Sequence, residues 1–238
     1  MKKGVFIVFI VFILNSNYVI ASVYRDNFQA YKLGTNTLQP VWIPQYSSLV
    51  EVVRKDSNKF VRLNYLTPFN GDRDLHIELN RNIYQPKELQ WAFRVIACNS
   101  TWKKSESVTP QGASAYLYYY DENNFIDVEF KVYANSSYCG DGLAQLSAFK
   151  RVNRVSTPLI PYTRFPFIMN RWYRAKIEFI KYNLTHYNYT VYLDNTFLAN
   201  SLNISLGEIK EGRVLLENGG TVSDFDEVSV YFDMNSKN

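Results

Sequence analysis

The feature that most constrains the fold is the regular alternation of side chains along residues 125–133. One face of this segment is mixed and largely polar and the other is apolar, in the order Phe125, Ile126, Asp127, Val128, Glu129, Phe130, Lys131, Val132. A period of two residues is typical of a strand with one buried face. Segments 89–98, 171–181 and 187–193 follow the same rule, and no segment shows a sustained period of 3.6 residues. The sequence therefore predicts a chain built from strands.

Turn signals recur between these segments. Residues 121–124 form an Asp/Glu/Asn cluster, Asp194-Asn195 predicts a tight hairpin turn, and Gly219-Gly220 precedes the last segment. The chain is 47% hydrophobic, with 19 Tyr, 16 Phe and 4 Trp, so it can bury a large core, and disorder is excluded. Many short strands with frequent turns indicate an all-β fold, an antiparallel two-sheet sandwich forming one domain over residues 22–238.

The first 21 residues predict a signal peptide. Lys2 and Lys3 precede an apolar run from Gly4 to Leu14, and Ala21 supplies the small residue expected before a cleavage site. This run is shorter than the about 20 apolar residues that span a bilayer, and no second long apolar run follows. We therefore expect a secreted or cell-surface protein without a transmembrane span after cleavage.

An oxidising compartment gives two further expectations. Cys98 and Cys139, the two cysteines of the chain, most simply form one disulfide, which would close a loop of about 40 residues. Five Asn-X-Ser/Thr sequons predict glycosylation on solvent-facing loops or edges, at Asn99, Asn135, Asn183, Asn188 and Asn203.

Charge and metal-ligand content exclude several classes of protein. The 26 Lys and Arg barely outnumber the 22 Asp and Glu, which is too weak a surplus to indicate nucleic acid as a partner. Two His and two Cys argue against a zinc site or a His-based catalytic relay, and no cofactor is indicated. A structural calcium site is left open by loop carboxylates without EF-hand-like spacing, at Asp72, Asp74, Asp121 and Asp141.

Three parts of the chain resemble the concanavalin A-like, or laminin G-like, jelly rolls. One pattern of this chain resembles the opening strand of that superfamily and consists of Asp26, Asn27, Phe28, Tyr31, Gly34 and Trp42. Residues 170–179 and 190–198 resemble its characteristic hairpin, with Asn195 where Gly is usual. Residues 212–216 and 225–230 resemble the closing strand, which pairs with the first. The resemblance implies the fold and leaves the function open, because the superfamily includes lectins, glycosidases, lyases and adhesion modules.

Residues 125–130 also resemble the E-x-D-x-E strand of family 16 glycoside hydrolases. In that family the first Glu is the nucleophile, the Asp assists, and the last Glu is the general acid/base. Asp127 and Glu129 match, but Phe125 occupies the nucleophile position, so a retaining mechanism on this strand lacks its nucleophile. We interpret the two carboxylates as part of the solvated face of a curved sheet.

A second enzymatic resemblance lies at residues 76–81, His-Ile-Glu-Leu-Asn-Arg. This segment is similar to the R-x-E-L-R strand of jelly-roll polysaccharide lyases, which also use a Gln-x-His pair that this chain lacks. Alternation predicts Ile77 and Leu79 in the core, with Glu78 facing outward.

A hypothesis that rests on no motif is sugar binding by aromatic rings. Pyranose faces stack on exposed rings, while sugar hydroxyls bond to polar side chains. Tyr116, Tyr118, Tyr120 and Tyr133 are expected to share one sheet face, and Trp102 lies in a polar loop.

Three functions remain open. We prefer a secreted, glycosylated carbohydrate-binding or adhesion module without an intact catalytic motif, whose partner is a glycan or cell-surface polysaccharide. The second is a glycan-cleaving enzyme, a glycoside hydrolase or a polysaccharide lyase, which predicts a cleft with two close carboxyl groups. The third is a structural cell-surface or filament subunit, which predicts an unpaired edge strand or a free N-terminal extension such as residues 23–28.

Overall fold

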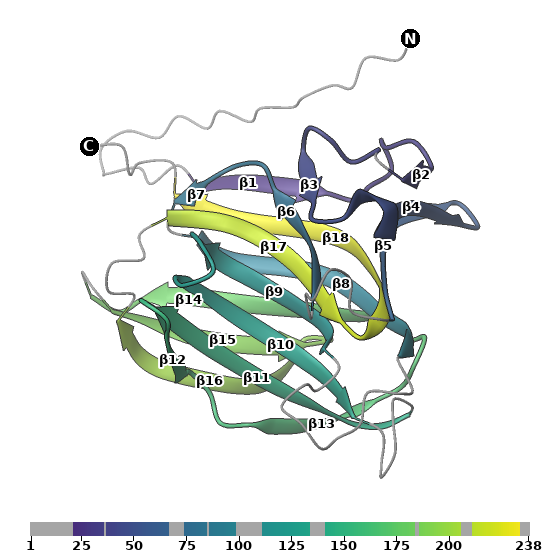
Figure 1. Cartoon of the computed structure of the whole chain (residues 1–238). Coiled ribbons are helices and arrows are strands. Elements are labelled where there is room, and N and C mark those ends of the chain that lie inside the picture. Colours follow the sequence, from purple (N-terminus) through teal and green to yellow (C-terminus); the bar gives the residue numbers. More distant parts are fainter. Residues whose placement is uncertain are drawn as a thin grey trace, which may run out of the picture.

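The computed structural model describes residues 21–35, 37–66, 74–84, 86–98, 111–133, 141–183, 186–205 and 211–233. Residues 1–20 of the expected signal peptide lie outside this part of the chain. Within it, two antiparallel sheets face each other as the layers of a sandwich (Figure 1). The sandwich predicted from the alternation of side chains is confirmed.

Sheet A contains the two ends of the described chain. Its strands run in the order β16 (Thr196–Ser205), β15 (His186–Leu193), β14 (Tyr173–Lys181), β8 (Pro86–Cys98), β18 (Thr221–Asp233), β5 (Asn58–Tyr65), β4 (Val50–Lys55) and β2 (Gly34–Thr35), with β1 (Ala21–Asp26) also paired to β18. The short helix η1 (Ser47–Leu49) precedes β4.

Sheet B carries the long strands in the foreground of Figure 1. Its order is β12 (Val155–Pro158), β11 (Gly142–Val152), β10 (Phe125–Tyr133), β9 (Gln111–Tyr119), β17 (Glu211–Gly219), β6 (Leu75–Leu79) and β3 (Trp42–Pro44), with β13 (Thr163–Phe167) on β11 and β7 (Ile83–Tyr84) on β17.

Aromatic rings join the two sheets in the core. The Phe130 ring of β10 lies 5.1 Å from Phe93 and 6.0 Å from Trp91, both on β8, and 5.8 Å from Phe165 of β13. All four side chains are buried. Along β10 the buried apolar residues alternate with residues that face away from sheet A, so every second side chain of this strand is available on the outer face of sheet B.

Strand β18 organises sheet A. It pairs with β8 along almost its whole length, while its other edge pairs first with β5 over Thr221–Phe225 and then with β1 over Val228–Asp233. The backbone changes direction between the two partners at Glu227, whose φ is 50°. The expected pairing of the first and last strands is confirmed, and β1 is therefore not a free extension.

The opening landmark residues gather around one carboxylate. Asp26 Oδ2 accepts hydrogen bonds from the Tyr24 hydroxyl at 3.0 Å, the Tyr31 hydroxyl at 2.7 Å and Trp42 Nε1 at 2.9 Å. Trp42 is fully buried, so its indole N–H needs this acceptor. The carboxylate thus ties β1 to β3, a strand of the other sheet.

The hairpin between β15 and β16 turns as predicted. Asp194 and Asn195 have φ values of 49° and 63°, and Leu193 pairs with Thr196 across a two-residue loop. Asn tolerates this left-handed conformation better than most residues, which explains why it can stand where Gly is usual.

A cluster of buried charges joins three neighbouring strands of sheet A, β8, β18 and β5. Asp224, fully buried on β18, accepts from Arg94 Nε at 2.8 Å and from Arg62 Nε at 2.8 Å. Arg94 is itself buried and its guanidinium lies 4.9 Å from the Phe60 ring centre and 4.8 Å from that of Trp172. Neither charge can return to water without unfolding this region.

We expect Asp224→Ala to lower the free energy of unfolding by about 3–5 kcal/mol, because it leaves Arg94 buried without its counter-charge. The matched control is Arg174→Ala, which removes an exposed ion pair with Glu227 and should cost about 0–1 kcal/mol. Urea unfolding measures both values. Equal costs for the two substitutions would show that the buried pair is not stabilising.

Candidate functional site

The strand register of sheet B places polar side chains in a row on its outer face. Directly paired residues on adjacent strands point to the same face. One such row crosses β11, β10, β9, β17 and β6 and contains Ser147, Glu129, Ser114, Glu217 and His76. The next row contains Phe149, Asp127, Tyr116, Leu215 and Glu78.

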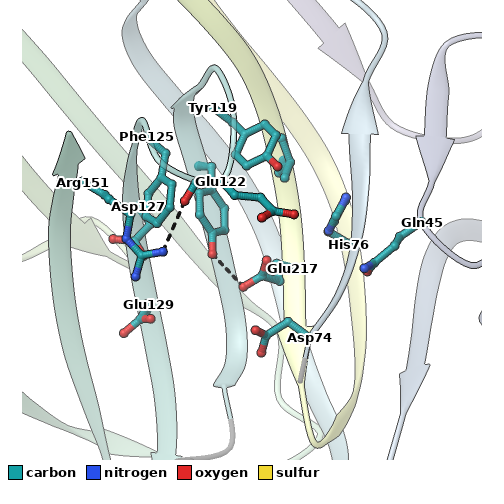
Figure 2. A pocket seen from close by; sticks show the side chains of 12 residues that line it. Gln45, Asp74, His76, Tyr119, Glu122, Phe125, Asp127, Glu129, Arg151 and Glu217 are labelled. Carbon is teal, nitrogen blue, oxygen red and sulfur yellow. Dashed lines mark hydrogen bonds between the residues drawn. The ribbon is translucent and has the colours of Figure 1, made fainter. Parts of the chain in front are cut away.

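Six residues of these two rows form the floor of a pocket of about 360 Å³, namely Glu129, Glu217, His76, Asp127, Tyr116 and Leu215. Figure 2 shows its side chains converging from the strands of sheet B and from the loop after β9. The lining residues are Gln45, Asp74, His76, Tyr116, Tyr119, Glu122, Phe125, Asp127, Glu129, Arg151, Leu215 and Glu217. Its volume falls in the range of about 300–1,000 Å³ that is usual for small-ligand sites.

Aromatic rings form one wall of the pocket. The rings of Tyr119 and Phe125 are nearly parallel, with an interplanar angle of 24° and centres 6.5 Å apart. Tyr116 packs edge-on against both, at 5.1 Å from Phe125 and 5.9 Å from Tyr119. The Arg151 guanidinium lies 4.9 Å from the Phe125 ring centre and donates to the Glu122 carbonyl at 3.2 Å, which holds this wall to the loop.

Glu217 is a buried carboxyl group at the centre of the floor. Only 5% of the residue is exposed, and its Oε1 accepts a hydrogen bond from the Tyr116 hydroxyl at 2.9 Å. Burial raises the pKa of Glu217 well above its ordinary value, and the negative charges of Asp74, Asp127 and Glu129 raise it further, against the opposing effect of the Tyr116 bond.

Asp127 and Glu129 lie across β9 from Glu217. Burial and the neighbouring Glu129 raise the pKa of Asp127, although the Phe149 amide donates to it at 2.9 Å. Glu129 accepts from the Ser147 hydroxyl at 2.8 Å and forms an ion pair with Lys131 at 2.6 Å. Exposed fractions of 4% for Asp127 and 7% for Glu129 show that the expectation of a solvated face was wrong, because the pocket walls screen this part of it.

Glu78 faces outward as predicted, with Ile77 and Leu79 in the core. It forms an ion pair with Arg213 of β17 and does not line the pocket. Its neighbour His76 does line the pocket, through the register that places it beside Glu217.

The tyrosines of β9 do not share one face. Tyr116 lines the pocket, but Tyr118 is fully buried in the core, where its ring packs 5.7 Å from Phe179. The prediction for Tyr118 is wrong because β9 contains a bulge, in which the three steps from Tyr116 to Tyr119 lie against the two from Arg213 to Leu215. Tyr120 follows the end of β9, is 61% exposed and does not line the pocket.

Several predicted residues lie outside the described part of the chain. These are Trp102, Asn99, Asn135, Cys139 and Asp72, and the side chains of Tyr133 and Asn203 are likewise not described. The disulfide from Cys98 and the glycosylation of the sequons stay predictions. Asn183 is exposed at the end of the β14–β15 hairpin, and Asn188 is half-buried on β15.

The loop carboxylates proposed for calcium have other partners. Asp121 accepts from the amide of Asn123 and the side chain of Asn124, and Asp141 accepts from the Met169 amide. Asp74 lines the pocket beside Glu217. Among the described residues, no group of three or more His, Cys, Asp or Glu is placed to hold a metal ion. The same residues contain no helix long and apolar enough to cross a membrane.

Six residues of the pocket were not among the candidate site residues of the sequence, namely Gln45, Tyr119, Glu122, Arg151, Leu215 and Glu217. For Glu217 a signal existed, because alternation from Val214 and Leu216 in the closing segment places residue 217 on the outer face. For Tyr119 the bulge removed any such signal.

Comparison with known proteins identifies the fold. No protein-family model and no curated protein matches the chain. Among solved structures, the alginate lyase Aly36B superposes with a TM-score of 0.57 at 9% identity, covering 90% of this chain and 97% of the lyase. The β-glucanase of Bacillus licheniformis gives 0.54 at 10% identity, covering 89% and 98%, and the basic winged bean lectin gives 0.53 at 10%, covering 89% and 98%. The chain therefore has the concanavalin A-like jelly-roll fold, as the sequence resemblance implied.

The raised pKa of Glu217 predicts a dependence of stability on pH. Above its ordinary pKa of 4.5, the folded protein retains a proton that the unfolded chain has released, so the free energy of unfolding falls as the pH rises through this range. The glutamine of Glu217→Gln cannot ionise, so we expect this variant to have a higher melting temperature than the wild type at about pH 8. The expected shift is about 2–4 °C for each kcal/mol added to the free energy of unfolding.

The gain should vanish below about pH 4, where the carboxyl group is protonated in both states. Thermal unfolding at the two pH values measures it. Glu178→Gln, on β14 of sheet A, is the control and should show no such gain. If Glu217→Gln melts at a lower temperature than the wild type at about pH 8, the assigned direction of the pKa shift is wrong.

Proposed function

We propose that the chain is a secreted glycan-binding module and that the pocket on the outer face of sheet B holds a saccharide unit. The observation that carries this proposal is the combination, in one pocket, of an aromatic wall with a floor of hydrogen-bonding side chains (Figure 2). A sugar ring has an apolar face that stacks on aromatic rings and hydroxyl groups that bond to carboxylates and amides.

The parts of the pocket are arranged to meet both sides of a sugar. Tyr119, the half-buried ring of the aromatic wall, offers the stacking surface, and the buried rings of Phe125 and Tyr116 support it. Glu217 and Asp127 offer acceptors on the floor, and Gln45 approaches from the opposite side of the pocket in Figure 2. Buried polar groups of this kind specify hydroxyl positions, because a ligand without the matching donors would leave them unpaired.

The solved structures with this fold agree with the proposal. One of them is a variant of the same alginate lyase in complex with alginate trisaccharide, and the winged bean lectin is in complex with Tn-antigen. Secretion rests on the signal peptide expected at residues 1–21, and a glycan outside the cell is the partner that such a location would offer.

The test is affinity electrophoresis of the mature chain through gels cast with a panel of neutral and charged polysaccharides. We expect at least one polymer to retard the protein, and Tyr119→Ala to weaken that binding about tenfold, which corresponds to about 1.4 kcal/mol. Tyr182→Ala is the control, since its ring is 68% exposed at the end of β14 on sheet A. If no polymer retards the wild type, the chain does not bind glycans; if Tyr119→Ala binds normally, the pocket is not the site.

The charges of the pocket predict which glycans bind. Its lining contains the carboxyl groups of Asp74, Asp127 and Glu217, among others, against the single guanidinium of Arg151. A uronate adds one more carboxylate to carboxyl groups whose mutual repulsion already raises the pKa of Asp127 and Glu217, so that it either meets like charge or requires the uptake of a proton. Either cost is of the order of 1 kcal/mol or more. We expect a neutral β-glucan to bind about tenfold more tightly than alginate, as measured by retardation at equal polymer concentration.

Salt provides the control for this charge effect. At about 1 M salt the screening length is only about 3 Å, so the difference between the two polymers should narrow. Tighter binding of alginate than of the neutral polymer at low salt would show that the carboxyl groups do not govern selectivity.

A further inference from the structure

We propose that the pocket also cleaves the glycan that it binds, by inverting hydrolysis, with Glu217 as general acid and Glu129 as general base. This inference rests on the proposed function, because the glycan must first occupy the pocket. It uses a pair of carboxyl groups on two different strands, and not the Asp127-x-Glu129 pair of a single strand.

The register of sheet B places the two groups opposite each other. Glu129 on β10 and Glu217 on β17 both pair with Ser114 of β9, so the three residues form one straight row across the floor. Both glutamates line the pocket. The residue between them, Ser114, is buried in the sheet and has a small side chain.

The separation of the two strands suits an inverting reaction. Adjacent strands lie about 4.8 Å apart, so the backbones at Glu129 and Glu217 are about 9.6 Å apart. Inverting glycosidases hold their two carboxyl groups about 6.5–9.5 Å apart, to leave room for a water molecule, whereas retaining enzymes need about 5–5.5 Å. Because Glu129 and Glu217 project from one face and their backbones lie two strands apart, we infer the wider arrangement for their carboxyl groups.

The two groups differ in the charge of their neighbours. Glu217 is surrounded by the carboxyl groups of Asp74 and Asp127, and its hydrogen bond comes from the neutral hydroxyl of Tyr116. Burial and the two neighbouring carboxyl groups favour the protonated form of Glu217, against the opposing effect of the Tyr116 hydrogen bond. Glu129 instead has a positively charged neighbour, because it forms an ion pair with Lys131, and it accepts a hydrogen bond from Ser147.

The reaction balances with water as the second reactant. Glu129 removes a proton from a water molecule, whose oxygen forms a bond to the anomeric carbon from the face opposite the leaving group. The bond from the anomeric carbon to the glycosidic oxygen breaks, and Glu217 donates its proton to that oxygen. Proton exchange with solvent restores both groups. The aromatic wall holds the sugar ring in place between the two glutamates during this exchange.

The test uses the polymer that most strongly retards the mature chain in the affinity gels. We expect wild type to release new reducing ends from it, and both Glu217→Gln and Glu129→Gln to lose at least about 100-fold of this rate while still being retarded. The matched control is Glu178→Gln on β14, which should cleave at the wild-type rate. Thermal unfolding checks that each variant is folded.

A second measurement requires no variant. Proton NMR during cleavage by the wild type should show that the first product has the opposite anomeric configuration to the substrate bond. Retention of configuration would overturn the proposed pair, and so would undiminished cleavage by Glu217→Gln. Retardation without any new reducing ends would overturn the hydrolysis while leaving the binding function intact, whereas the absence of retardation would overturn both.

Discussion

Burial of one face of the central strands of sheet B, β10, β9, β17 and β6, against sheet A is the constraint on which the site depends. A strand that slips by one residue exchanges all of its inward and outward side chains. On β10 such a slip would move Phe130 out of its contacts with Trp91 and Phe93 and would bring Glu129 into the core. The apolar face thereby fixes the register that aligns Glu129, Ser114 and Glu217. Core packing, through the register, is what positions the chemistry of the pocket.

The pocket lowers the stability of the fold that supports it. Carboxyl groups are costly to bury without a counter-charge, and Glu217 and Asp127 are each surrounded by further acidic groups. The protein has the means to pair such groups fully, as the Arg62–Asp224–Arg94 cluster on the opposite sheet shows. This contrast between the two clusters supports the proposed role of the acidic pocket in glycan binding and hydrolysis.

Alternation predicted the strands and the fold because it depends only on which side of a strand meets the core. It placed Ile126, Val128 and Phe130 correctly, and it placed Asp127 and Glu129 together on the outer face. It could not predict that this face is walled in, since the burial of Glu129 depends on residues far along the chain. Nor could it predict the bulge in β9, which turns Tyr118 into the core and places Tyr119 on the outer face instead. The partnership of Glu129 with Glu217 required the order of the strands, which no local pattern contains.

The pairing of Ala21 with Asp233 brings the two ends of the described domain to the same point of sheet A. A linker attached at either end therefore leaves from one corner, while the pocket lies on the outer face of the other sheet. Such a domain could be joined end to end by a short connection and reopened at the Asp194-Asn195 turn with both layers kept intact. The domain is therefore suited to insertion into a larger protein, with the pocket of sheet B still facing outward.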